Sequence, residues 1–499
     1  MFSRLRKLFS RTPQRIAPAQ FREGFERKLR AGYESARTTD ENERYWAFTD
    51  VLSPAASTNP GVRSRIRSRA RYEIENNSYA SGILATLSHD VVGTGPRLQV
   101  TTESGARNKE IELAWNRWAD EVQLASKLRT ARISKASDGE VFFLFKTNRR
   151  LTTPAMLDVK LIEADQIATP EGVYDDESRA VDGIRFDRWG NPKSYHLLKS
   201  HPGAQYSLNH LPTDYETVSS ADMLHWFTEK RPNQYRGISE LAPSLSLFAK
   251  LRRYTHAVIA AAETAADFAA VMYTDEPADG GSAVETDWFK SVPIEYRSMI
   301  TLPDGWKMGQ FKAEQPTTTY REFQRQVVSE MARCLCMPYN IAAGDSSEYN
   351  YSSGRLDHLS YWLSIDVERS HLATVVLEKI YRAWLTEHLA ETSGISPRDI
   401  TIADQYPHKW IWASRPPIDP EKHANAVVKL WDKGLLTDHQ YLYAEGVDPD
   451  EHFEQLADSI KRREESGAPV PGVAITNTTT GNETDDESSK ETPSVAKEP

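Results

Sequence analysis

The sequence predicts a mostly helical α+β protein, and three observations support this fold class. Apolar side chains recur every three or four residues over 319–337 and 355–384, which is the spacing of long amphipathic helices. Short apolar runs separated by turn residues fill 140–235, as expected for antiparallel strands. Helical segments that begin with an N-cap residue and a proline return after residue 418. Because the chain has 499 residues, we expect several compact parts.

Composition and charge narrow the classes of function. Hydrophobic residues make up 39% of the chain and aromatic residues 10%, which suits a folded but rather polar protein. A net charge of −10 argues against general electrostatic binding of nucleic acid. The chain has no apolar run of membrane-spanning length and no apolar segment typical of a secretory signal. We therefore expect a protein without a membrane partner, made in a reducing cytoplasm.

Basic residues are concentrated near the N-terminus. Residues 1–30 carry nine Lys or Arg and two Glu, and we expect 1–29 to form a basic, flexible arm, since isolated helices this short are marginal. Arginines recur at 63, 65, 67, 69 and 71, where we predict a helix or the segment leading into one. They could form a phosphate-binding stripe or pair with acidic neighbours in an assembly. We favour ion pairing, because charged stripes are usually solvated or paired.

The sequence carries no recognisable catalytic motif, and we predict that the protein is not an enzyme. Its histidines lack metal-binding spacing, and it has no Walker lysine or Gly-x-Ser-x-Gly turn. The glycines of Val92–Pro96 fit a helix end and turn better than a nucleotide-binding loop. Cys334 and Cys336 have no further zinc ligands and are expected to be buried, reduced thiols. Asp345 and Glu348 lack the remaining ligands of a calcium loop, so we predict neither a metal nor a cofactor.

Residues 140–235 are predicted to form an antiparallel sheet that packs on the preceding helices. Trp189–Pro192 supplies turn residues between two of its strands. The predicted strands are 141–145, 157–162, 183–186, 194–198 and 223–227.

A long alanine-rich helix is predicted to follow this sheet. Pro243 suits its first turn, and an uninterrupted helix from Pro243 to Met272 would extend about 45 Å. Bulky apolar residues become rare past Val258, while eight alanines lie between 257 and 270. Small side chains allow close helix packing, so we infer that this face packs against copies of the same helix. The residues assigned to that contact are Ala257, Ala261, Ala265 and Ala269.

Two further helices are predicted on either side of a polar loop. Thr319 and Glu322 match a capping box at the start of the first helix, and Pro338 should end it near Met337. Asn340–Gly354 is small, polar and aromatic, which predicts a loop. The apolar stripe of the first helix comprises Phe323, Val327, Met331 and Leu335. The residues predicted to point inward from the second helix are Leu356, Leu359, Trp362, Leu363, Val367, Leu372, Val375, Val376, Ile380 and Trp384.

The C-terminal region is predicted to contain three short helices and a tail. Asp419-Pro420 begins the first helix, Thr437 caps the second, and Asp448–Glu451 opens the third as a capping box. Residues 391–460 hold thirteen Asp or Glu against six Lys or Arg, which is a poor fit to DNA reading by these helices. Beyond Gly467 the composition predicts disorder.

Several short segments share a family pattern. They are Arg71–Ala80, Val91–Pro96, Asp187–Pro192, Arg236–Ser239, Cys336–Asp345 and Tyr349–Ser353. These segments span roughly residues 30–460 and follow one another in the order that the family has. Through them the sequence resembles the lambda-type portal proteins of tailed bacteriophages.

The resemblance implies a ring-forming subunit with wing, stem, clip and crown parts and long stem helices. The implied parts are a basic arm at 1–29, an α+β wing at 30–236, a first stem helix at 237–272, a clip at 273–315, a second stem helix at 316–337, a tunnel loop at 338–354, a long wing helix at 355–390, a helical crown at 391–465 and a disordered tail at 466–499.

The resemblance also implies a function. A dodecameric ring at one capsid vertex would let double-stranded DNA pass, without sequence specificity, during packaging and ejection. The implied partners are further copies of the chain, the terminase large subunit, the major capsid protein and scaffold, and a head-completion or tail adaptor protein. The protein would be found in the virion and, during assembly, in the host cytoplasm. The alternatives are another capsid or tail structural protein, or an enzyme of nucleic-acid processing.

Two sets of site residues follow from the resemblance. The tunnel loop would border the narrowest part of the channel, with Tyr349 and Tyr351 as bulky wall elements, and Trp288, Phe289 and Tyr296 of the clip would dock the packaging motor. The assigned loop residues are Gly344, Asp345, Ser346, Ser347, Glu348, Tyr349, Asn350, Tyr351, Ser352 and Ser353.

Overall fold

The computed structural model describes most of the chain between residues 51 and 469. The described residues are 51–170, 180–204, 214–267, 271–274, 306–309, 319–347, 349–394, 406–415, 417 and 419–469. The predicted arm, most of the predicted clip and the tail beyond residue 469 lie outside them. The chain divides into two compact units, Met1–Ser53 and Pro54–Pro499, and every element below belongs to the second. No helix among the described residues is long and apolar enough to cross a membrane.

Asparagine caps define the first long helices. The Asn59 side chain accepts a hydrogen bond from the amide of Val62 at 3.0 Å, and Asn77 ends one helix while capping the next. Gly93 then ends the third helix with φ at +58°, and a strand follows, which confirms the prediction of a helix end and turn. These elements are α1 (Pro54–Ser57), α2 (Pro60–Asn76), α3 (Ser78–Val92), β1 (Arg97–Val100), α4 (Gly105–Glu121) and α5 (Leu124–Asp138).

The predicted strands are confirmed, but they form two antiparallel sheets and not one. Strand β2 pairs with β3 and β8, while β4, β5, β6 and β7 form the other sheet in that order. The strand at 215–219 was not predicted. The strands are β2 (Glu140–Thr147), β3 (Leu157–Ile162), β4 (Ala180–Val181), β5 (Ile184–Phe186), β6 (Pro192–Leu198), β7 (Tyr215–Ser219) and β8 (Met223–Phe227).

Strand β2 lies between two hydrophobic cores. Val141 and Phe143 join the larger core, whereas Phe142 and Leu144 join a second core with residues of the four-stranded sheet. Successive side chains of a strand point to opposite faces, so one strand can serve both cores. This central position explains why all four side chains are at most 2% exposed.

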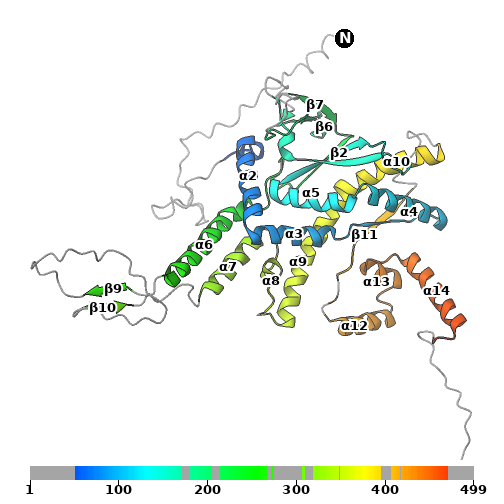
Figure 1. Ribbon diagram of the computed structural model, residues 1–499. Coiled ribbons are helices and arrows are strands. Elements are labelled where there is room, and N and C mark those ends of the chain that lie inside the picture. The colour runs from blue at the N-terminus through cyan, green and yellow to red at the C-terminus, as the bar shows by residue number, and fades with distance from the viewer. Residues whose placement is uncertain are drawn as a thin grey trace, which may run out of the picture. The chain divides into compact units, whose positions relative to one another are not determined.

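A group of helices extends from this body. Helix α6 contacts α7, and α7 contacts α8, and Figure 1 shows α6, α7, α8 and α9 in that order. Helix α9 continues through a π-helical turn, Ala373–Leu377, into α10. The helix predicted to reach Met272 ends earlier, because Val271–Thr274 is a strand, β9, that pairs with β10 (Trp306–Gly309). The helices are α6 (Leu245–Asp267), α7 (Tyr320–Arg333), α8 (Tyr339–Ala343), α9 (Tyr351–Leu372) and α10 (Glu378–Ser393).

Aromatic packing holds distant segments of the large core together. The Trp115 ring centroid lies 4.9 Å from that of Trp118, 5.2 Å from that of Trp384 and 5.5 Å from that of Trp410. The Trp118 indole also donates a hydrogen bond to the carbonyl of Leu157 at 2.8 Å. Helix α4, helix α10 and strand β11 (His408–Ile411) therefore share one core, and β11 pairs with β1.

The three predicted C-terminal helices are confirmed. Thr437 and Gln440 form a reciprocal capping box, and the side chains of Asp419 and Asp448 accept amide hydrogen bonds at the starts of their helices. The Tyr443 hydroxyl donates to the Trp410 carbonyl at 2.8 Å, which ties this region to β11. The helices are α12 (Pro420–Asp432), α13 (Asp438–Ala444) and α14 (Pro449–Ser466).

Candidate functional site: the loop between α8 and α9

The predicted loop between the two helices is shorter than expected. Helix α8 occupies Tyr339–Ala343, and α9 already begins at Tyr351, so the connecting loop is 344–350. Gly344 ends α8 with φ at +64°, a conformation that favours glycine. No pattern in the sequence marks α8 separately, because its five residues lie within one stretch of small and polar residues.

Helix α7 holds the first half of this loop. Arg321 Nη2 donates a hydrogen bond to the Ser347 hydroxyl at 3.0 Å, and the guanidinium lies 3.6 Å from the Asp345 carboxylate. The Ser347 amide donates to Asp345 Oδ1 at 3.0 Å. Hydrogen bonds from the Ser347 side chain and amide, together with the charges of Arg321 and Arg325, lower the pKa of Asp345. The loop therefore carries an ionised carboxylate at neutral pH.

Arg325 of α7 holds the second half of the loop. Its guanidinium carbon lies 5.0 Å from the ring centroid of Tyr339 at the start of α8 and 5.5 Å from that of Tyr349 in the loop. A cation shared between two aromatic rings links both ends of the α8–loop segment to α7. Asn340 of α8 donates to the His358 ring on α9 at 3.5 Å, a weak contact that completes the frame.

The structure brings together only part of the predicted loop set. Gly344, Asp345, Ser346, Ser347, Tyr349 and Asn350 form the described loop, whereas Glu348 lies outside the described residues. Tyr351, Ser352 and Ser353 form the first turn of α9.

The structure describes only some of the other predicted site residues. Ala257 and Ala261 are exposed on α6. The Ala265 side chain, Ala269 and the clip residues lie outside what the structure describes. The clip residues concerned are Trp288, Phe289 and Tyr296.

The capping prediction for α7 is wrong. Thr319 has helical φ and ψ of −84° and −6° and makes no side-chain capping hydrogen bond, whereas a cap of this kind needs extended backbone. Of the predicted stripe, Met331 and Leu335 are buried, but Phe323 is 50% exposed. The prediction of two buried thiols is wrong for Cys336, which is exposed where the chain turns with φ at +56°, and Cys334 is only half-buried.

The predicted inward face of α9 is also wrong over its first half. In this half of the helix the buried residues are Tyr361 and Ile365, because polar contacts with other helices turn that side of α9 toward the core. The Tyr361 hydroxyl donates to Asp90 at 2.8 Å, and Lys135 donates to Glu368 at 2.5 Å. The side chains of both donors are buried. The residues that face outward, against prediction, are Leu356, Leu359, Leu363 and Val367.

The arginine-rich segment is the helix α2, and it pairs with acidic residues of its own chain. Arg67 donates to Asp165 at 2.8 Å, and Arg71 makes two hydrogen bonds to Asp138 at 2.9 and 2.6 Å. Arg65 and Arg69 point to the exposed side. Ion pairing is thus confirmed, but within the subunit, and the inward arginines are not a phosphate-binding stripe.

A buried carboxylate on β2 was missed by sequence reasoning. Glu140 is fully buried and accepts hydrogen bonds from Arg236 at 2.7 to 3.0 Å and from the Gly237 amide at 2.9 Å, with His225 Nε2 also at 2.9 Å. Burial alone would raise the pKa of Glu140, but the Arg236 charge and the His225 contact hold it well below its usual range. Gly237 is needed here, since a Cβ would lie 2.1 Å from the Gly139 carbonyl oxygen.

A cluster of two carboxylates and a histidine near the end of β3 is already paired with an arginine of the same chain. Glu163, Asp165 and His201 lie close enough to share a metal ion. However, the Arg71 guanidinium is 2.9 Å from Asp165 and 3.4 Å from Glu163, so a protein side chain already balances their charge.

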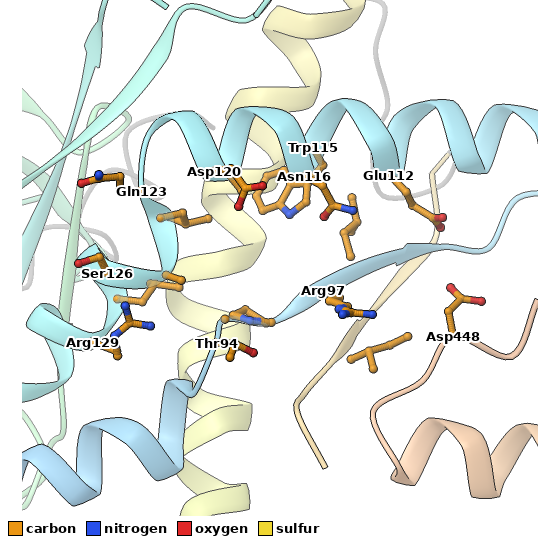
Figure 2. Close-up of a pocket in the computed structure, with 18 of the residues that line it drawn as sticks. Thr94, Arg97, Glu112, Trp115, Asn116, Asp120, Gln123, Ser126, Arg129 and Asp448 are labelled. Carbon is orange, nitrogen blue, oxygen red and sulfur yellow. The ribbon is translucent and has the colours of Figure 1, made fainter. Parts of the chain in front are cut away.

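A pocket of about 720 Å³ is lined by α4, the start of α5, β1 with the turn before it, and the start of α14. Figure 2 shows Glu112, Arg97 and Asp448 at one end of it, on three different elements. Burial, together with Asp448, Asp450 and Glu451, raises the pKa of Glu112 to about 7, although the Val100 amide donates to its carboxylate at 2.7 Å. The carboxyl group is therefore sensitive to pH near neutrality.

Comparison with known proteins identifies the family. A family model described as "Phage portal protein, lambda family" matches residues 41–369, which include α2 to α8, the loop and most of α9. The chain belongs to the lambda family of phage portal proteins. A "Probable portal protein" of Halomonas phage phiHAP-1 is 24% identical over 436 residues, covering 81% of this portal protein and 82% of that one.

Solved structures of gene transfer agent (GTA) particles are also similar to this portal protein. A chain of the "Neck of empty GTA particle computed with C6 symmetry" has a TM-score of 0.44 and 12% identity, and covers 75% of this chain and 91% of its own. A chain of the "Neck of native GTA particle computed with C12 symmetry" has a TM-score of 0.45 and 12% identity, with coverage of 77% and 93%.

Proposed function

We propose that this portal protein assembles into a closed dodecameric ring at one capsid vertex, and that double-stranded DNA passes through the central hole. The observation that supports assembly is the apolar surface left uncovered on a long helix. Leu356, Leu359 and Leu363 of α9 are 66%, 49% and 68% exposed. A contiguous apolar face of this kind is typical of a protein contact site.

The loop 344–350 is proposed to border the hole, together with Tyr351, Ser352 and Ser353. DNA that must slide cannot be bound tightly through its phosphates, so the lining should offer few free cations. The ionised Asp345 meets this requirement, and Arg321 and Arg325 already contact loop groups. Tyr349 is held by Arg325 and would act as a bulky, fixed element of the wall.

Partners and location follow from this role. We propose that the clip docks the terminase large subunit through Trp288, Phe289 and Tyr296, and later docks a head-completion or tail adaptor protein. The major capsid protein and scaffold would surround the ring, which would form in the host cytoplasm and remain in the virion. The role is structural and not catalytic. Purified protein without ATPase and nuclease activity is the expected result.

Deleting Ser346–Asn350 tests the role of the loop. The deletion should leave ring formation at the wild-type level, because the loop joins α8 and α9 without entering the core, but it should remove most DNA packaging. Rings are counted by negative-stain microscopy, and packaged DNA is measured as nuclease-resistant genomes. Replacing Ser346 alone by Ala is the control and should package normally. Normal packaging by the deletion protein would refute the proposed role of the loop.

A further inference from the structure

Helix α9 is apolar on two sides, and only one of them is covered within the subunit. Its inner side buries Tyr361 and Ile365. The outer stripe comprises Leu356, Leu359, Leu363 and Val367, which are 66%, 49%, 68% and 65% exposed. Spacings of three and four residues place the stripe on one face, over about 17 Å of helix. We call these four residues the α9 stripe.

A second uncovered apolar surface lies on α6 and α7. Tyr254 of α6 is 39% exposed and Phe323 of α7 is 50% exposed, and their ring centroids are 5.3 Å apart. Ala257 and Ala261 follow Tyr254 at i+3 and i+7, so they share its face, and both are exposed. We call these four residues the α6–α7 patch. Two rings beside small side chains leave room for branched aliphatic side chains from another molecule.

The two surfaces belong to different ends of one group of helices. Helix α6 contacts α7, α7 contacts α8, and α8 reaches α9 through Asn340 and His358. Figure 1 shows α6 and α7, which carry the α6–α7 patch, as the first two helices of this order, and α9, which carries the α9 stripe, as the last. Because the residues of both surfaces are exposed, the two surfaces are not packed on each other within the subunit, and each remains available to another copy.

Each surface has charged residues of both signs beside it, with Arg355 and Asp357 beside the α9 stripe and Arg253 and Glu322 beside the α6–α7 patch. Arg355 precedes the α9 stripe, and Glu322 lies next to Phe323 in the α6–α7 patch. Both are exposed, and neither makes an ion pair with another of the residues that the structure describes. An interface that buried both surfaces can therefore pair Arg355 with Glu322 at its polar rim, and pairs of this kind favour correct docking.

We infer that the α9 stripe of one subunit packs on the α6–α7 patch of the next. The two surfaces differ, so the contact is head-to-tail, and repetition of such a contact gives a ring when the rotation from one subunit to the next closes after a whole number of copies. This inference rests on the proposed ring function and names the surfaces that form it. Under this inference the exposed Ala257 and Ala261 receive leucine side chains from α9 of the neighbouring subunit, in place of the copy of their own helix that the sequence predicts.

Charged substitutions in the α9 stripe test the interface. Leu359→Glu combined with Leu363→Glu should weaken each subunit contact about 100-fold or more, because two buried leucines become charged. Light scattering with size-exclusion chromatography should show folded monomers where the wild type gives rings. Leu113→Glu is the matched control, because Leu113 of α4 is 58% exposed but belongs to neither surface. It should assemble like the wild type.

Each outcome of this experiment decides something. Rings at wild-type yield from the double variant would overturn the inference and leave the proposed ring function standing. A wild-type protein that stays monomeric, with the α9 stripe protected by its own chain, would overturn both. Circular dichroism of the double variant checks folding, and loss of helical signal would call for the milder Leu363→Ser, whose ring yield then decides the inference.

Cross-linking tests which surface the α9 stripe contacts. In a background with Cys334→Ser and Cys336→Ser, one batch carries Leu363→Cys and another carries Ala261→Cys. A flexible bis-maleimide should give a covalent dimer between the two variants only when the batches are mixed and assembled. Leu113→Cys in place of Leu363→Cys should give none. Rings that form without the mixed cross-link would overturn the pairing of these two surfaces while leaving the ring itself supported.

Discussion

At the scale of single residues, the fully buried Glu140 carboxylate joins β2 to β8 and to the segment around Arg236. Replacing it by alanine would leave Arg236, which is 1% exposed, without its carboxylate. We expect Glu140→Ala to lower the free energy of unfolding by about 3–5 kcal/mol, the usual result of breaking a buried ion pair by removing one partner. Urea denaturation of the subunit measures the change.

A control variant at the surface and the pH dependence of stability distinguish loss of the buried Glu140 ion pair from the loss of one negative charge. Glu454 pairs with Lys109 at the surface, and Glu454→Ala should leave the urea midpoint unchanged. Because the pKa of folded Glu140 lies below its ordinary value of 4.5, its contribution is present above that pH and is lost as pH falls through the lower, folded pKa. Equal losses for both variants would contradict the assignment of Glu140 as a buried hub.

The sequence predicted some of these residues and not others, for a physical reason. The alternating arginines indicated ion pairing, and their place in a helix is confirmed. The acidic partners of Arg67 and Arg71 lie 98 and 67 residues away, and no local pattern marks them. Glu140 gave no signal either, because its environment is created by strand pairing and by the close approach of Gly139 and Gly237.

At the scale of elements, the seating of α14 against α4 should depend on pH. Lys109 pairs with Glu454 across this contact, whereas Glu112 faces Asp448, Asp450 and Glu451. The pKa of Glu112 is raised from 4.5 to about 7. Burial is the largest cause of this rise, and the three carboxylates at the start of α14 add to it, so the seated state favours the protonated form of Glu112. That stabilisation is fully present below pH 4.5 and is lost as pH rises through about 7.

Hydrogen exchange of the α14 amides measures this dependence. After correction for intrinsic exchange rates, wild-type protection should fall between pH 5 and pH 8, a range of about three units that spans the raised pKa. Glu112→Gln should keep the protection nearly constant. Glu110→Gln, an exposed neighbour on α4, is the control and should retain the wild-type fall. A Glu112→Gln profile identical to the wild type would show that this carboxyl does not control the contact.

Elements with local signals were predicted best. Thr437, Asp419 and Asp448 mark helix starts that the structure confirms, since capping involves neighbouring residues only. Helix α8 was missed because a five-residue helix within a polar stretch has no periodicity to detect. The face of α9 was assigned wrongly because both of its sides are apolar, and only its contacts with α3 and α5 decide which side is inward.

At the scale of the whole molecule, the family and fold class could be predicted because motifs are spread along the chain in a fixed order. The α+β body and the helices predicted for it are present, and the family match is confirmed. The arrangement of subunits could not be read from apolar periodicity, because the same leucine pattern fits a core face or a contact between subunits. The exposed fractions of the α9 stripe distinguish these possibilities within one subunit.

Ring formation makes a prediction about the stability of the whole assembly. A subunit that buries the α9 stripe only in the ring gains stability by mass action, so its apparent melting temperature should rise with protein concentration. Each tenfold increase in concentration favours an association step by about 1.4 kcal/mol. Differential scanning calorimetry over two decades of concentration measures the effect.

The variant with Leu359→Glu and Leu363→Glu should melt at one temperature at every concentration, and Leu113→Glu should follow the wild type. The wild-type protein could form rings and still melt at a temperature that does not depend on concentration. In that case the subunit would gain no stability from its neighbours, which would contradict burial of these leucines between copies.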